Sequence, residues 1–288
     1  MGLGLKVLHL ALELKKNDLF KDFKNVIDMG DQDLQIQYDT LKKELHFIND
    51  DNFEEMFRRA KFFPERPRVS SSALWKSLGF KNCDRLDIEK IERDNSDVCN
   101  NFVKIDLNFP IEKQTKHDTY DLVTDLGNNE HPFNIVESYK TMHKLCNKNG
   151  IMLIHQNIFG GNGFYNFDIS FFENLAAANN YSILYSCYTF DYKNEYFNLP
   201  INENLKKCIN LNIANDIGVF YIFKKNTDKD FIMPYQGSGT SPDRKEVFIS
   251  KISKFNNIPS RTYVPKSIND FSAKDIVKAL LRKLKIIK

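Results

Sequence analysis

An apolar run that ends in an acid and then in a glycine turn is the feature that most constrains how this chain folds. It covers residues 24–33, where Val26 and Ile27 lead into Asp28 and then into Gly30. A buried strand followed by a glycine turn is how α/β folds hold nucleotide-like cofactors. The segment therefore predicts where a site lies. It does not predict the substrate, because many chemistries reuse this turn.

Predicted strands and helices alternate from residue 24 to about residue 225. Further strands are predicted over 83–88, 102–107, 120–125 and 150–155, and helices over 73–78, 135–146 and 171–179. This alternation is typical of an α/β, Rossmann-like fold, a mostly parallel sheet with helices on both faces. Two late strands, 181–190 and 218–224, are expected to form an antiparallel pair that closes the sheet edge.

The predicted domain is 24–225, preceded by an N-terminal helical cover at 1–23 and followed by an extension at 226–288. Asp28 and Asp87 are 59 residues apart, against roughly 20 in a minimal nucleotide-binding unit. An insertion at 34–68 explains the excess. It is expected to be a lid or an acceptor-recognition element over the cofactor, and the alternative is a contact between copies in a homo-oligomer.

The end of the extension, 272–288, has the pattern of a basic amphipathic helix. Apolar residues fall on one helical face, and lysines and arginines crowd the remainder. One interpretation is peripheral contact with the inner face of an anionic membrane. The other is a helix docked on its own domain or on a second subunit.

Composition narrows the function classes further. The 41 Lys and Arg residues against 38 Asp and Glu leave a net charge of +3, which gives no general reason to expect a nucleic-acid partner. The five cysteines form no Cys-x-x-Cys pair, so neither a disulfide framework nor a zinc site is indicated, and a cytoplasmic location fits best. No apolar run reaches the ~18 residues that span a bilayer.

Acids stand at the ends of four predicted strands, namely Asp28, Asp87, Asp106 and Asp125. Ligands of open parallel sheets bind outside the carboxyl ends of the strands, and an acid after the second strand commonly accepts both ribose hydroxyls. Asp87 is the candidate for that role and Glu89 the fallback. A turn or helix-cap function is the alternative for any single one of these acids.

The first loop also helps to choose the cofactor. Asp31 and Asp33 lie where a dinucleotide enzyme would bring in a pyrophosphate, which disfavours NAD. The same carboxylates would attract the sulfonium and ammonium groups of S-adenosylmethionine.

In this order of elements, from Asp28 to about Lys224, the chain resembles a class I S-adenosylmethionine-dependent methyltransferase. The family's three-glycine loop is reduced here to Gly30. The resemblance implies the following cofactor contacts: Asp28, Gly30 and Gln32 at the methionine moiety, Asp87 at the ribose, Asp106 and Leu107 at the adenine, and Asp125 and Gly127 near the transferring methyl group.

Segments 124–131, 161–166 and 231–236 are also similar to a poorly characterised bacterial methyltransferase-like group. The expected function is methyl transfer to a small or carbohydrate-linked acceptor, as O-methylation, with a surface-polysaccharide precursor as one such acceptor. A non-catalytic methyltransferase-like binding protein is one alternative. A nucleic-acid methyltransferase is another, but Asp125-Leu126-Gly127 stands where an Asn-Pro-Pro-Tyr-type motif would be expected.

Methylation of a hydroxyl needs a base within hydrogen-bond reach of the acceptor. His131, after the fourth strand, and His155, at the end of the fifth, are the first candidates, followed by Glu130 and Tyr165. The alternatives are a turn residue before a proline for His131 and a buried, hydrogen-bonded histidine for His155. Asp125, Glu130 and the two histidines lack metal-ligand spacing, so no metal is expected.

Overall fold

The computed structural model describes residues 2–36, 38–44, 69–91, 100–116, 118–192, 195–201 and 217–235. Of the predicted insertion 34–68, only 34–36 and 38–44 belong to these ranges, and the predicted helix 272–288 lies wholly outside them. Within these ranges, no helix has the length and apolar character needed to cross a membrane.

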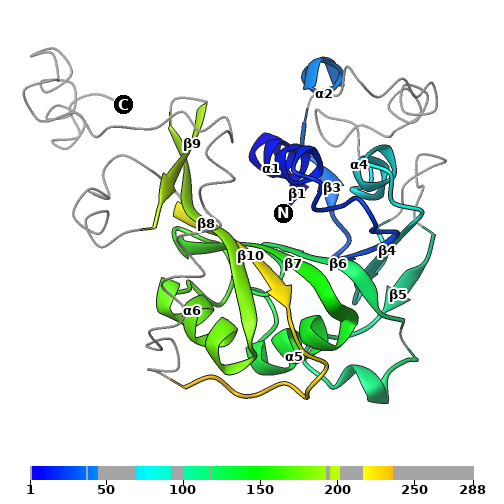
Figure 1. Ribbon diagram of the computed structural model, residues 1–288, viewed down its shortest axis with the longest axis vertical. Coiled ribbons are helices and arrows are strands. Elements are labelled where there is room, and N and C mark those ends of the chain that lie inside the picture. The colour runs from blue at the N-terminus through cyan, green and yellow to red at the C-terminus, as the bar shows by residue number, and fades with distance from the viewer. Residues whose placement is uncertain are drawn as a thin grey trace, which may run out of the picture.

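An eight-stranded sheet organises the described part of the chain, in the order β5-β4-β2-β6-β7-β10-β8-β9 (Figure 1). The first five of these strands pair in parallel. The predicted α/β, Rossmann-like sheet is confirmed. The strands of this sheet are β2 (Asn25–Met29), β4 (Asn82–Asp87), β5 (Phe102–Lys104), β6 (Tyr120–Leu126), β7 (Cys146–Phe159), β8 (Tyr181–Tyr192), β9 (Glu195–Pro200) and β10 (Ile217–Lys225).

The predicted antiparallel pair is confirmed as β8 and β10, and β10 lies between β7 and β8. Residues 217–223 of β10 are buried, and alternate residues of the strand belong to the core clusters on the two faces of the sheet. The sheet edge is instead formed by β9, which pairs with β8 and was not predicted from the sequence.

Helices cover both faces of the sheet (Figure 1). One face carries α1 (Leu5–Lys16) and α4 (Ser72–Ser77), and the other carries α5 (Ile135–Leu145) and α6 (Ile169–Ala178). Asn134 and Asp168 cap the starts of α5 and α6 by accepting backbone N–H groups. The smaller elements are β1 (Gly2–Leu3), which pairs in parallel with β3 (Asp33–Leu34), α2 (Tyr38–Glu44), and a 3₁₀ turn at Ile111–Lys113.

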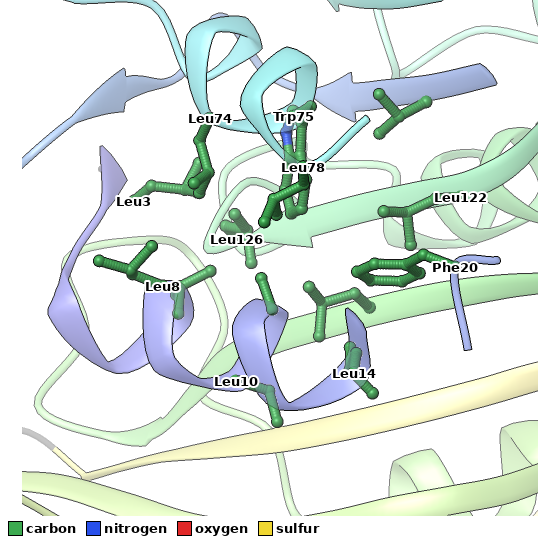
Figure 2. Packing of buried hydrophobic residues seen from close by; sticks show 14 of the residues in the cluster. Leu3, Leu8, Leu10, Leu14, Phe20, Leu74, Trp75, Leu78, Leu122 and Leu126 are labelled. Carbon is green, nitrogen blue, oxygen red and sulfur yellow. The ribbon is translucent and has the colours of Figure 1, made fainter. Parts of the chain in front are cut away.

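The core on the α1 and α4 face joins the first helix to the centre of the sheet. Leu8 and Leu14 of α1 belong to one buried cluster with Trp75 of α4 and Leu122 of β6, and all four side chains are inaccessible to solvent. Figure 2 shows these residues converging between the two helices and β6. Helix α1 therefore packs its apolar side chains on this face of the sheet.

A buried carboxyl group ties α4 to the sheet. Asp28, near the end of β2, is wholly buried and accepts hydrogen bonds from the Ser71 hydroxyl, the Thr124 hydroxyl and the Trp75 indole N–H, the last at 2.9 and 3.0 Å. Burial raises the pKa of Asp28, and the three donors oppose this effect. One side chain thereby fixes β2 to β6 and to α4.

We expect Asp28→Asn to lower the free energy of unfolding by about 3 kcal/mol or more, because it replaces one acceptor oxygen by an NH2 donor that faces buried donors. Trp75→Phe keeps an aromatic ring but removes the indole N–H donor and part of the buried volume, and it should cost about 2 kcal/mol or more. Urea denaturation followed by circular dichroism measures both. Two variants as stable as the wild type would show that this bond set does not hold the fold.

Candidate functional site

The carboxyl ends of the parallel strands meet at one edge of the sheet, and two glycine turns lie there. Gly30 follows β2 with φ of 92°, and Gly127 follows β6 with φ of 77°, both in the left-handed region that favours glycine. A Cβ atom on Gly30 would lie 2.7 Å from the Asn128 side-chain oxygen and 2.7 Å from Gln32 Nε2. The turns after β2 and β6 therefore pack against each other, and Gly30 is required by this close approach.

Asp87, at the end of β4, accepts two backbone N–H groups and stays partly exposed. Its Oδ2 accepts the Asp31 backbone N–H at 2.8 Å and its Oδ1 accepts the Ile88 N–H at 2.7 Å. The side chain is partly exposed. Since an ionised carboxylate offers about four lone-pair sites, each oxygen retains room for one further donor, such as one of two neighbouring hydroxyls.

The charge of the first loop is largely neutralised within the protein. Asp31 is 5% exposed and forms an ion pair with the fully buried Arg85, and its second oxygen accepts the Ile91 N–H at 2.7 Å. Asp31 is therefore not the free negative charge that the sequence suggested for attracting a sulfonium. Arg85 was missed in the sequence, although an arginine inside the apolar strand 83–88 signals a buried partner.

Asp106 and Leu107 follow β5 in a turn that Gln114 fixes. Gln114 Oε1 accepts the Asp106 N–H at 2.7 Å, and its Nε2 donates to the Asp106 carbonyl oxygen at 2.8 Å. Asp106 Oδ1 accepts both the backbone N–H and the side-chain amide of Asn108. The partly exposed Asp106 is held in one orientation at the edge, where the resemblance places adenine.

Asp125 has a different role from Asp87 and Asp106. It is fully buried and accepts the backbone N–H groups of Asn128 and Asn129, at 3.1 and 3.0 Å, and the Gln156 side-chain amide at 2.7 Å. Burial raises its pKa to about 6. Asp125 therefore supports the turn 125–131 from beneath, as Asp28 supports the end of β2. A direct cofactor contact by either side chain would require it to leave these donors.

Glu130 lies at the far end of this turn in a dry environment. Its side chain is buried, the Asn157 amide lies 3.3 Å from Oε2, and a Cβ atom on Gly163 would lie 2.6 Å from Glu130 Cγ. Burial, and then the neighbouring Asp125, raise the pKa of Glu130 to about 7. A carboxyl group with such a pKa can exchange a proton near neutral pH.

The structure separates the other predicted bases. His131 is 43% exposed, lies 3.7 Å from Glu130 Oε1, and has a pKa lowered by partial burial. The His155 ring packs on Phe220 with centroids 4.5 Å apart, and burial lowers its pKa well below the usual value. The Tyr165 hydroxyl donates to the Phe133 carbonyl oxygen at 2.5 Å. Glu130 and His131 are adjacent at the edge, whereas His155 lies over the core.

No three histidine, cysteine, aspartate or glutamate side chains of the described ranges gather closely enough to hold a metal ion.

The roles of Asn157 and Gln156 were not anticipated from the sequence. Both side chains stand near the end of β7 and meet acids of the turn after β6, a contact that only strand pairing creates.

The sheet order decides the fold. Strands β5-β4-β2-β6-β7 reproduce the 3-2-1-4-5 order of doubly wound sheets, and the antiparallel strand β10 stands between β7 and β8. The chain has a doubly wound, Rossmann-like α/β fold. A search of family models gives no match, and neither does a search of curated proteins.

Several solved structures are similar to the chain at low identity. One is the O-methyltransferase from the trans-AT PKS multienzyme of Brevibacillus brevis in complex with S-adenosyl-L-homocysteine, with 11% identity, a TM-score of 0.44, and coverage of 86% of this chain and 78% of that chain. Another is a SAM-dependent methyltransferase from Archaeoglobus fulgidus, with 15% identity, a TM-score of 0.39, and coverage of 75% and 93%. Because both TM-scores are below 0.5, the fold is assigned from the strand order and not from these similarities.

The pKa of Glu130 predicts a pH dependence of stability. The pKa of Glu130 in the folded state is about 7, above the ordinary 4.5. Between these two pH values the carboxyl group ionises in the unfolded chain but stays protonated in the folded one, so the free energy of unfolding falls as the pH rises from 4.5 toward 7. Across this range the wild type should lose on the order of 2 kcal/mol relative to Glu130→Gln. The exposed Glu89→Gln is the control. If the free energy of unfolding changes equally with pH in the wild type and in Glu130→Gln, the carboxyl group of Glu130 is not buried as the structure has it.

Proposed function

We propose that the protein transfers a methyl group from S-adenosylmethionine to a hydroxyl of a small or carbohydrate-linked acceptor. The observation that carries the proposal is the meeting of the Gly30 turn, Asp87 and the Glu130 turn at one edge of a doubly wound sheet. In open α/β sheets this edge is the ligand-binding edge. One carbohydrate-linked acceptor of this kind is a surface-polysaccharide precursor.

The described residues fit the cofactor at this edge. Asp87 would accept the ribose hydroxyls, Asp106 and the Leu107 backbone would face the adenine, and the turn of Gly30 and Gln32 would approach the methionine moiety. When bound, S-adenosylmethionine supplies a methyl group on a sulfonium that an in-line nucleophile can displace.

Glu130 is the base that this proposal favours. The acceptor hydroxyl must lose a proton as its oxygen attacks. The Glu130 carboxylate, whose conjugate acid has a pKa of about 7, is suited to accept this proton near neutral pH. The Asn157 amide orients the carboxyl group, and Gly163 leaves room for it. Glu130 therefore replaces His131 and His155 as the first candidate, and His131 stands beside it.

A non-catalytic binding protein is the second candidate, because two observations favour it. The glycine loop retains only Gly30, and the Asp31 charge is neutralised by Arg85. Such a protein would bind the nucleoside part of the cofactor through Asp87 and would yield no methylated product.

Isothermal titration with S-adenosylmethionine and S-adenosylhomocysteine tests the cofactor site. We expect micromolar binding by the wild type and at least about 10-fold weaker binding by Asp87→Ala, because two hydroxyls lose a charged acceptor. Asp22→Ala, an exposed acid just before β2 at the opposite edge, is the matched control. A folded wild-type chain that binds neither compound would overturn the proposal.

Transfer of a radiolabelled methyl group to a panel of hydroxyl acceptors tests the base. With an acceptor found in this way, kcat should rise with pH through about 7 as Glu130 ionises. Glu130→Gln should lower kcat by roughly 10²-fold or more and leave S-adenosylhomocysteine binding unchanged. Retention of kcat within a factor of about three would remove Glu130 from the mechanism and leave His131 to be tested as His131→Asn.

A further inference from the structure

A cavity of about 320 Å³ lies at the edge of the sheet opposite to the ligand-binding edge. Thr119 just before β6, Cys146 at the start of β7 and Lys225 at the end of the antiparallel β10 all line it. Small-molecule sites in proteins commonly have volumes of about 300–1,000 Å³, so the cavity has room for a small metabolite. None of the residues proposed to bind the cofactor or the acceptor lines it.

Lys225 is a buried cation that lines this cavity. The residue is 5% exposed, and its ammonium donates to the carbonyl oxygens of His143 and Cys146, at 2.8 and 2.9 Å. An ammonium carries three N–H donors, so one N–H of Lys225 has no acceptor among the described residues. No carboxylate of the described ranges forms an ion pair with Lys225 either.

A buried charge without an opposite charge destabilises a protein, and buried cations are nearly always paired. The two carbonyl oxygens lie at the C-terminal end of α5, where their partial negative charge stabilises the ammonium in part. They do not neutralise it, and burial lowers the pKa of Lys225. An anion in the cavity would supply both the missing acceptor and the missing negative charge.

The other charged side chains around the cavity balance one another. They are two exposed lysines, two exposed aspartates and a third lysine that forms an ion pair with Glu112, namely Lys148, Lys229, Asp228, Asp230 and Lys144. Lys225 therefore provides the excess positive charge of the cavity.

Hydrogen bonds fix the wall of the cavity in place. His143 Nε2 donates to the Lys229 carbonyl oxygen at 2.8 Å, and the His143 ring meets the Phe231 ring edge to face, with centroids 5.7 Å apart. The Asn179 side chain forms two hydrogen bonds with the Ile232 backbone, at 2.9 and 2.7 Å. The segment after β10 is thereby fastened to α5 and to the end of α6, so the cavity exists before a ligand binds.

The chemistry of the cavity suits an oxyanion. An oxyanion accepts several N–H and O–H donors at once, and hydrogen bonds from an ammonium are among the strongest. Thr119 and Asn147 line the cavity beside Lys225, and their hydroxyl and amide groups can donate as well. Phe231 and the His143 ring add apolar surface for the carbon part of a ligand.

We infer that this cavity binds a small molecule through an oxyanion group, a phosphate or a carboxylate, which pairs with Lys225. The site is separate from the proposed methyl-transfer site, since it lies at the opposite edge of the sheet. Its test therefore does not depend on the proposed function.

Isothermal titration of the full chain with inorganic phosphate, glycerol 3-phosphate and malonate, at constant ionic strength, tests the site. At least one of them should bind, and the phosphate and malonate arms distinguish the two kinds of oxyanion. Lys225→Met keeps the length of the side chain and removes its charge, so it should weaken binding at least about 10-fold. The matched control is Lys81→Met, because Lys81 is exposed just before β4 at the same edge and does not line the cavity.

Thermal unfolding separates anion binding from a purely structural role of Lys225. A ligand that binds only the folded chain raises its melting temperature. The oxyanion should therefore raise the melting temperature of the wild type and of Lys81→Met, but not that of Lys225→Met. A folded wild-type chain that binds none of the three oxyanions would overturn the site, as would equal binding by the wild type and Lys225→Met.

A second variant decides the matter if Lys225→Met does not fold. Asp228→Asn combined with Asp230→Asn removes two exposed negative charges beside the cavity and leaves the bonds of Lys225 intact. It should tighten oxyanion binding about threefold or more, a gain that damage to the fold would not produce. Unchanged or weaker binding by this double variant would overturn the site.

Discussion

The bond set around Asp28 is the constraint on which the rest of the structure depends. A carboxyl group with no solvent access is stable only if its oxygens are satisfied, and here Ser71, Trp75 and Thr124 satisfy them. Because Asp28 stands two residues before Gly30, these bonds fix the direction in which the chain leaves β2. The position of the Gly30 turn, and with it the whole ligand-binding edge, follows from this one buried group.

The four acids at the strand ends divide into two kinds. Asp28 and Asp125 are wholly buried, and their donors are the side chains and backbone of neighbouring elements. Asp87 and Asp106 are partly exposed and keep oxygen atoms at the edge. The buried pair holds the turns in place, and the exposed pair is available to a ligand. Glu130 is buried like the first pair, and burial raises its pKa to about 7, so that it can gain or lose a proton near neutral pH.

The fold was predictable because its signals are local. Apolar runs, strand-end acids and helix periodicity each fall within about ten residues, and they predicted the parallel sheet and the antiparallel pair. The partners of the acids were not predictable, because Asp28 meets Trp75 and Thr124, and Asp125 meets Gln156, only through tertiary contacts. For the same reason the sequence suggested a free Asp31, which Arg85 neutralises.

A crystal structure of the chain with S-adenosylhomocysteine is the decisive test of the proposed cofactor site. We expect the ribose hydroxyls at Asp87, the adenine beside Asp106 and Leu107, and the homocysteine sulfur directed toward Glu130. Density instead in the cavity of about 320 Å³ at the opposite edge, which His143, Lys225 and Phe231 line, would contradict it.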